Sequence, residues 1–301
     1  MKIFHIGICV YPKPIWLAAS LKKLGEYIEC RPEIPDAQIL AMFHKFKPDL
    51  VFMQIQEGDI VAVKTVAEMA RTAKVINWTG DVRQPIPRWY YTIAPHVLTC
   101  FSNETDVANF RRARARAEYL QIGIDPLIFN RWPNSAGADV VFMANYYGGM
   151  FPLSAFRKGA AINLKQSFGR KFNLLGNGWN GREDGNLNGN QLAESQFYSG
   201  SKIGINISHY SLERYTSDRL FRIMASGCFC LSHYYPGIEK DFKIGEHLDV
   251  FADFNIMRNK VRHYLDNPDK RQQIANNGYD LVHRKFTTDN MAKEILRLYE
   301  L

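Results

Sequence analysis

Two carboxylates directly follow short apolar segments in the first third of the chain. Asp81 comes after KVINWTG and Glu57 after VFMQIQ. If these segments are strands, both side chains lie where strands end, and a carboxylate held there can take the proton from an attacking hydroxyl group. We predict Asp81 as a catalytic base, with Glu57 as the second candidate. The alternative is that Asp81 caps a turn or pairs with Arg83.

An anion-binding motif is predicted in TSDRLFRIMASG, residues 216–227. Thr216 or Ser217 would begin a helix, and Gly227 would end it. The free backbone N–H groups and the macrodipole at a helix start favour an anion. Arg219, in the first turn, can hold a diphosphate through two parallel hydrogen bonds. The plainer alternative is a capped helix whose apolar residues pack in the core.

Other segments that follow predicted strands complete the candidate donor site. Glycines in GNGWNG let the backbone approach a ligand, and the tryptophan of this loop can cover a nucleobase. The alternative is that these segments are ordinary surface turns. The candidate donor-binding residues in them are Gly7, Asn145, Tyr146, Gly176, Asn177, Gly178, Trp179, Gly237, Ile238 and Glu239.

Aromatic and basic residues suggest where an acceptor binds. The segment QPIPRWYY contains rings that can stack on sugars or bases. The segment FRRARARAEY is predicted to place two arginines on one helix face, where they can contact a polyanion such as DNA. The alternatives are aromatic residues that cover the core and a solvated helix face. The candidate acceptor-binding residues are Arg83, Arg88, Trp89, Tyr90, Arg112 and Arg116.

The elements that must position these residues alternate between strands and helices. Short apolar runs such as KIFHIGICV and PDLVFMQIQ are typical of buried strands, and segments with helical spacing separate them. This alternation predicts βαβ units and parallel sheets, which bind ligands at the carboxyl ends of their strands. The polar segment 131–139 predicts a linker. We therefore expect an α/β protein with two Rossmann-like domains facing each other across a cleft, residues 1–132 and 138–287, with the helix 288–301 packing back on the first.

Composition excludes several classes of protein. The chain has 301 residues, enough for about two domains, and no apolar run approaches the roughly 20 residues of a membrane span. Its five cysteines are scattered without a CxxC pair, so we expect neither a metal site nor a disulfide framework. The start MKIFHIGICV lacks the order of a signal peptide, and we expect a cytoplasmic protein. The net charge of +8 is spread over both predicted domains and suits an anionic ligand.

The last hundred residues resemble a known family. The segments SKIGINIS, TSDRLFRIMASGCFCLSH, PGIEKDFKIGEHLDVF and NPDKRQQIANNGYDLVHRKFT occur in its order and spacing. They resemble the group-one glycosyltransferases of the CgeB-like type, which have the two-domain fold called GT-B. The resemblance implies a nucleotide-diphosphate sugar as co-substrate and no further cofactor or metal. One position departs from the pattern: many relatives have a glutamate that holds the ribose hydroxyls where this chain has Arg222.

The function expected from these features is sugar transfer from a nucleotide-diphosphate donor to a hydroxyl acceptor. The acceptor can be a glycan, a small molecule or a hydroxymethylated DNA base, as with phage-encoded enzymes of the same fold. Two alternatives stay open. One is a nucleotide-sugar epimerase of this fold, and the other is a non-catalytic nucleotide-sugar-binding protein. For the ribose, Glu213 or another group from the following loops can replace the missing glutamate.

Overall fold

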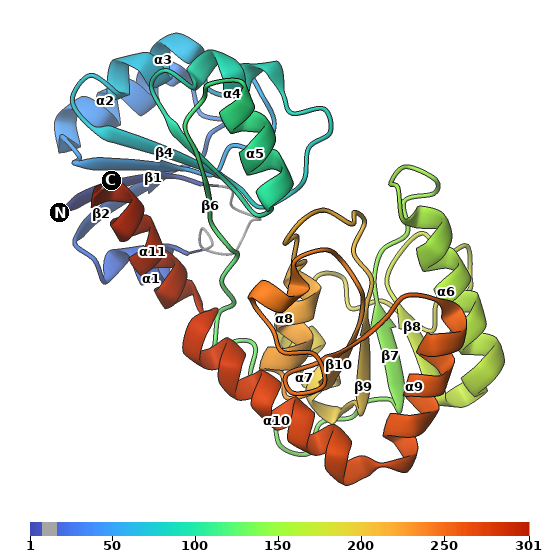
Figure 1. Ribbon diagram of the computed structural model, residues 1–301. Coiled ribbons are helices and arrows are strands. Elements are labelled where there is room, and N and C mark those ends of the chain that lie inside the picture. Colours follow the sequence, from blue (N-terminus) through green and yellow to red (C-terminus); the bar gives the residue numbers. More distant parts are fainter. Residues whose placement is uncertain (8–16, 301) are drawn as a thin grey trace. The chain divides into compact units, whose positions relative to one another are not determined.

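The computed structural model describes residues 1–7 and 17–300, and within these ranges the chain forms two compact units. The first unit comprises Met1–Gly123 and Thr288–Leu301, and the second Ile124–Thr287. Figure 1 shows that each unit has a parallel sheet covered by helices. Trp16 and Cys9, the latter in the predicted strand KIFHIGICV, lie outside the described residues.

The sheet of the first unit has six parallel strands in the order β2-β1-β3-β4-β5-β6. Because β1 lies between β2 and β3, the chain reverses its direction of travel across the sheet there, which is the switch point of a doubly wound fold. The strands are β1 (Lys2–Ile6), β2 (Glu26–Cys30), β3 (Leu50–Met53), β4 (Lys74–Thr79), β5 (Leu98–Phe101) and β6 (Ala117–Tyr119).

Successive strand residues of this unit enter two different cores, as the pleat requires. Phe4 and Val51 pack under one helical layer, whereas Ile3 and Leu50 pack under the other. The first layer contains α2 (Asp36–Phe46), α3 (Val63–Met69), α4 (Arg88–Ile93) and α5 (Glu104–Arg112). The second contains α1 (Ala18–Lys22) and α11 (Thr288–Glu300), so the last helix completes the core of the first unit (Figure 1).

The sheet of the second unit has five parallel strands in the order β11-β10-β9-β7-β8. Its switch point lies between β7 and β9, because β8 pairs with one edge of β7 and β9 with the other. The strands are β7 (Val140–Met143), β8 (Phe172–Leu175), β9 (Ile203–Asn206), β10 (Phe229–His233) and β11 (Asp249–Phe251).

Helices cover both faces of this second sheet. Helices α6 (Ser154–Phe168) and α9 (Phe254–Asp266) pack on one face. On the other lie α7 (Gln191–Gly200) and α8 (Asp218–Ala225) (Figure 1). Helix α10 (Pro268–Lys285) packs against α8 and adds Ile274 and Ala275 to the core of the first face. Helix α8 approaches β9 closely: a β-carbon at Gly204 would lie 2.7 Å from the side chain of Ile223. The helix with the functional motif is thus fixed on the central strand beside the switch point.

Three details differ from the sequence predictions. Residues 131–139, predicted as a linker, pack on the second unit, because Ser199 Oγ and Ser201 Oγ accept hydrogen bonds from backbone N–H groups of this segment. The aromatic segment QPIPRWYY is partly helical, because α4 begins at Arg88. The helix predicted to run to Arg116 ends at Arg112, and Arg114 adopts a φ of 60°.

Candidate functional site

An arginine bridges the two strands that separate at the switch point of the second unit. Arg219 Nε donates to the carbonyl oxygen of Met143, the last residue of β7, at 2.5 Å. Its Nη1 donates to the carbonyl oxygen of Ile207, just after β9, at 3.1 Å. The sequence predicted this residue in the first turn of the helix, and the structure places its guanidinium where ligands of doubly wound sheets bind.

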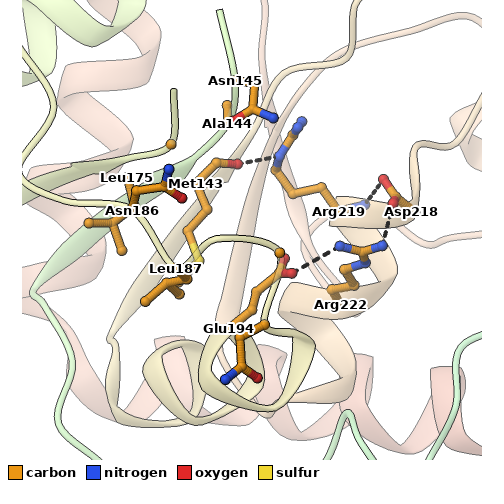
Figure 2. Close-up of a pocket in the computed structure, with 13 residues that line it drawn as sticks. Met143, Ala144, Asn145, Leu175, Asn186, Leu187, Glu194, Asp218, Arg219 and Arg222 are labelled. Atoms are coloured by element: carbon orange, nitrogen blue, oxygen red, sulfur yellow. Dashed lines mark hydrogen bonds and ion pairs between the residues drawn. The ribbon is translucent and has the colours of Figure 1, made fainter. Parts of the chain in front are cut away.

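A cavity of about 250 Å³ opens in front of this arginine and the start of α8 (Figure 2). Polar side chains of α7 and α8 and the carboxyl ends of β7 and β8 surround it. Three predicted site residues, Asn145, Gly176 and Arg219, and the atypical Arg222 lie in its wall. The remaining lining residues are Met143, Ala144, Leu175, Asn186, Leu187, Gly189, Asn190, Glu194 and Asp218.

Arg222 is held between two carboxylates on the wall of this cavity. Its Nη1 lies 2.9 Å from Glu194 Oε2 and its Nη2 lies 2.7 Å from Asp218 Oδ2 (Figure 2). Burial alone would raise the pKa of Asp218, but Arg222 and Arg219 outweigh burial and lower it. Burial likewise opposes the charge of Arg222, but its two acidic partners raise its pKa. Asp218 and Arg222 therefore remain charged near neutral pH.

A second arginine reaches the same switch point, and the sequence analysis did not identify it. The side chain of Arg157 is fully buried; its guanidinium donates to the carbonyl oxygens of Ile207 and, at 2.8 Å, Asn145. Burial and then the nearby Arg219 lower its pKa to about 8. The sequence contains a pattern that points to this residue. Arg157 lies at helical spacing from Ala161 and Leu164, so it occupies the buried face of α6.

A histidine lies beside these two arginines. His209 follows β9, and its Nδ1 is buried without a hydrogen-bond partner in the described chain. Burial, Arg157 and Arg219 lower its pKa to about 3, so the imidazole is neutral. The edge of the sheet therefore holds a concentration of positive charge and a neutral ring nitrogen, an environment suited to an anion.

Several predicted donor-binding residues serve the packing of two loops instead. Trp179 is buried, stacks on Tyr146 with 5.0 Å between ring centroids, and donates to the carbonyl oxygen of Ala144 at 2.6 Å. It therefore has no free ring face for a base. A β-carbon at Gly178 would lie 2.0 Å from the carbonyl oxygen of Tyr146, so this glycine permits loop contact. Asn177 N–H donates to Asn145 Oδ1 at 2.9 Å.

The predicted helix start differs in detail from a free anion site. The hydroxyl of Thr216 is buried and lies 2.6 Å from that of Tyr235. Ser217 is the N-cap residue of α8, but its hydroxyl donates to Asn206 Oδ1 at 2.9 Å. The backbone N–H of Arg219 donates to the Asp218 carboxylate. One amide of this turn is therefore engaged by a side chain of the same turn, and the guanidinium of Arg219 adds positive charge beside it.

The segment after β10 does not contribute to the wall of the cavity. Ile238 is fully buried, and its N–H donates to the carbonyl oxygen of Tyr235 within a turn. Gly237 adopts a φ of 77° at the start of that turn. Glu239 is exposed and forms a hydrogen bond with Tyr234. These three residues were predicted to bind the donor, and a local turn explains each of them.

In the first unit the two predicted carboxylates share one arginine. Arg83 Nη2 lies 3.8 Å from Asp81 Oδ2 and 3.9 Å from Glu57 Oε1, and both carboxylates are mostly exposed. The turn that carries Asp81 is fixed because its carbonyl oxygen accepts from Thr79 Oγ1 at 2.9 Å. Both the base prediction and its ion-pair alternative are compatible with this arrangement. The N–H of Gly7 donates to the carbonyl oxygen of Cys30 at 3.1 Å, so it is not free for a phosphate.

Two of the predicted acceptor-binding residues are buried and therefore cannot contact an acceptor. Trp89 and Tyr90 belong to the core and donate to the carbonyl oxygens of Val61 and Ile55, so neither ring is available for stacking. The basic candidates Arg88, Arg112 and Arg116 are exposed. Because α5 ends at Arg112, Arg112 and Arg116 do not share a helix face as predicted.

Neither a metal-ligating cluster nor a membrane-spanning helix is found among the described residues. No group of three or more His, Cys, Asp or Glu side chains there could hold an ion. None of the helices described combines the length and apolar character that crossing a bilayer requires.

Comparison with known families agrees with the resemblance seen in the sequence. Residues 158–297, a little under half of the chain, match the family described as glycosyl transferase-like. The match covers most of the second unit, including α8 and the cavity wall around it. None of the curated proteins compared by sequence matches this chain.

Several solved structures share the fold of this chain. The Anabaena protein HepE, in complex with UDP and glucose, has a TM-score of 0.71 at 13% identity, with 100% of both chains covered. Sucrose-phosphate synthase from Thermosynechococcus elongatus has a TM-score of 0.71 at 12% identity, with 99% and 98% covered. AviGT4, a glycosyltransferase of avilamycin A biosynthesis, has a TM-score of 0.62 at 14% identity, with 99% and 97% covered.

These comparisons confirm the GT-B fold and the resemblance to glycosyltransferases. At 12–14% identity the solved structures show the fold alone. The CgeB-like subgroup stays a prediction.

Proposed function

We propose that this protein transfers a sugar from a nucleoside diphosphate to a hydroxyl acceptor. The observation that carries the proposal is the position of Arg219, which spans the carboxyl ends of β7 and β9 at the mouth of a cavity. In support, the segment around this cavity matches a glycosyl transferase-like family, and the protein HepE of the same fold binds UDP and glucose.

The diphosphate of the donor binds at the positive end of this cavity. Arg219 and Arg157 both lie beside the ring of Phe142, with guanidinium carbons 5.9 and 5.4 Å from its centroid. Their hydrogen bonds to carbonyl oxygens fix both groups before a ligand arrives, so little reorganisation is needed. As the bond between the sugar and the diphosphate breaks, negative charge grows on the leaving oxygen, and these cations stabilise it without a metal.

The acceptor hydroxyl forms the new bond to the anomeric carbon and loses its proton. We propose Asp81 as the group that takes the proton if the configuration inverts, with Glu57 as the second candidate. Arg83 lies near both carboxylates, 3.8 Å from Asp81 and 3.9 Å from Glu57. If the configuration is retained, Asp81 orients the acceptor instead.

The donor part of the proposal is tested by ligand-induced stabilisation. A panel of UDP, GDP, ADP, CDP and their glucose conjugates is added to the protein, and the thermal midpoint is measured. We expect one nucleotide to raise the midpoint, and Arg219→Gln to reduce that rise. The matched control is Arg258→Gln, because Arg258 lies on α9 outside the cavity and binds only asparagines in the contacts described. No shift with any nucleotide would reject the proposal.

Turnover separates transfer from its two alternatives. The stabilising nucleotide sugar is incubated with glycans, small alcohols or hydroxymethylated DNA, and the products are analysed by mass spectrometry. Transfer requires one of these acceptors and is lost in Asp81→Asn if Asp81 is the base. An epimerase converts the donor without an acceptor, and a binding protein converts nothing. Salt-dependent binding of DNA would favour the DNA acceptor, because phosphate contacts release counterions.

A further inference from the structure

The cavity has walls of opposite electrostatic character. Arg219 supplies a cation at the end where β7 and β9 separate. On the side formed by α7, Glu194 supplies carboxylate oxygens that accept hydrogen bonds (Figure 2). An anionic group and a neutral group rich in hydroxyls would therefore occupy different ends of the same cavity, since carboxylates repel anions and accept from hydroxyl groups.

Glu194 is fixed in one place by its partner. Its side chain is 15% exposed, and Arg222 binds its Oε2 at 2.9 Å while also binding Asp218. Within the described part of the chain, Oε1 of Glu194 accepts no hydrogen bond. An ionised carboxylate can accept several hydrogen bonds, so the pairing with Arg222 leaves capacity for a ligand.

A vicinal diol is a chemical group that fits a mostly buried carboxylate of this kind. Its two hydroxyls can donate to one carboxylate, and charge-assisted bonds of this type are strong. In a nucleotide sugar both the ribose and the transferred sugar contain such a diol. The transferred sugar must meet an acceptor, whereas the ribose does not react and can lie against an enclosed wall.

Resting on the proposed function, we infer that Glu194 accepts hydrogen bonds from the ribose hydroxyls of the donor and that Arg222 is its positioning residue. The carboxylate that selects a ribonucleotide in this chain thus comes from α7, and the arginine of α8 holds it in place. Glu213, an alternative from the sequence, lies instead beside Lys240, 2.8 Å from its Nζ, and outside the cavity wall.

The test compares ribose with deoxyribose. The nucleoside diphosphate that binds best among UDP, GDP, ADP and CDP is titrated calorimetrically beside its 2′-deoxy and 3′-deoxy forms. We expect the wild-type protein to bind at least one deoxy form about tenfold or more weakly, the loss typical of a hydrogen bond to a charged group. We expect Glu194→Gln to reduce this preference to about twofold. The matched control Glu246→Gln, an exposed acid of the same unit, leaves it unchanged.

The role of Arg222 is tested through the ratio of the affinities for the ribonucleotide and its deoxy forms. A purely structural role of Arg222 would leave this ratio unchanged. Arg222→Gln should lower the preference for ribose although Glu194 is intact, and the conservative Arg222→Lys should retain most of it. Equal binding of all three nucleotides by the wild-type protein would overturn the inference without any variant. A preference that persists in Glu194→Gln would overturn it as well. Failure to bind any nucleotide would reject the proposed function instead.

Discussion

Arg157 is a charged residue at a fully buried position. It lies on the buried stripe of α6, and the contacts described join its guanidinium to carbonyl oxygens rather than to a carboxylate. Its Nε is buried without a hydrogen-bond partner in the described chain. A buried charge without a counter-ion is costly for folding, so its retention is explained if a ligand supplies the missing negative charge.

We expect Arg157→Met to weaken binding of the best nucleoside diphosphate by at least about tenfold, because a charged hydrogen bond is lost. The folded state should lose little stability or gain some, since apolar groups often replace buried ions without cost. Calorimetric titration and urea unfolding check the two parts. Lys158→Met is the control, because Lys158 is the exposed neighbour on the same helix. Unchanged affinity in Arg157→Met would contradict the role in diphosphate binding.

Among the elements, the loops after β7 and β8 depend on each other for their shape. Tyr146 N–H donates to the carbonyl oxygen of Asn177 at 2.8 Å, and Trp179 stacks on the Tyr146 ring. These contacts position Asn145 and Gly176 on the wall of the cavity. Gly178 therefore acts on the contact between the loops, whereas Gly176 lies in the cavity wall itself.

Gly178→Ala tests this dependence. Gly178 has a φ of 83°, and its β-carbon would lie 2.0 Å from the carbonyl oxygen of Tyr146, so we expect a loss of several kcal/mol of unfolding free energy and weaker nucleotide binding. Gly181→Ala is a matched control, since Gly181 has a φ of 76° with nothing within 4 Å of the added carbon. It should lose only about 1–2 kcal/mol. Equal losses in urea unfolding would show that steric contact between the loops is unimportant.

Across the whole molecule, the chain leaves the first unit after Gly123 and returns to it at Thr288. The returning helix α11 adds Met291, Ile295 and Leu298 to one core of the first unit. The second unit is therefore an insertion between two parts of the first. The first unit is complete only when the last helix of the chain is present.

Ile295→Ala should destabilise the first unit selectively. Ile295 is fully buried in that core, and its truncation should cost about 2–5 kcal/mol. Hydrogen exchange measured by mass spectrometry should show lost protection in β1, β3 and β4 and retained protection in β7 and β9. The control is Lys293→Ala, because Lys293 is an exposed residue of the same helix. This substitution should leave the hydrogen-exchange protection of both units unchanged. An equal loss of protection in both units would contradict the division into separate cores.

Local sequence patterns determined the order of the elements and the two-domain GT-B fold. The helix predicted to begin at Thr216 or Ser217 and to end at Gly227 is α8 (Asp218–Ala225), because periodicity and terminal residues act within a few turns. The same patterns placed Arg219 at the start of α8, where the cavity opens. They also indicated the carboxylates after β3 and β4, because parallel strands end at a common edge.

Only the tertiary structure decided which side chains those elements bring together. Glu194 and Arg222 are 28 positions apart in the sequence, and nothing local shows that α7 carries the partner of α8. Trp89 and Trp179 have rings of the kind that stack on ligands, but contacts with distant segments bury both of them. A side chain is exposed, paired or buried according to long-range packing, and periodicity and caps contain no information about that packing.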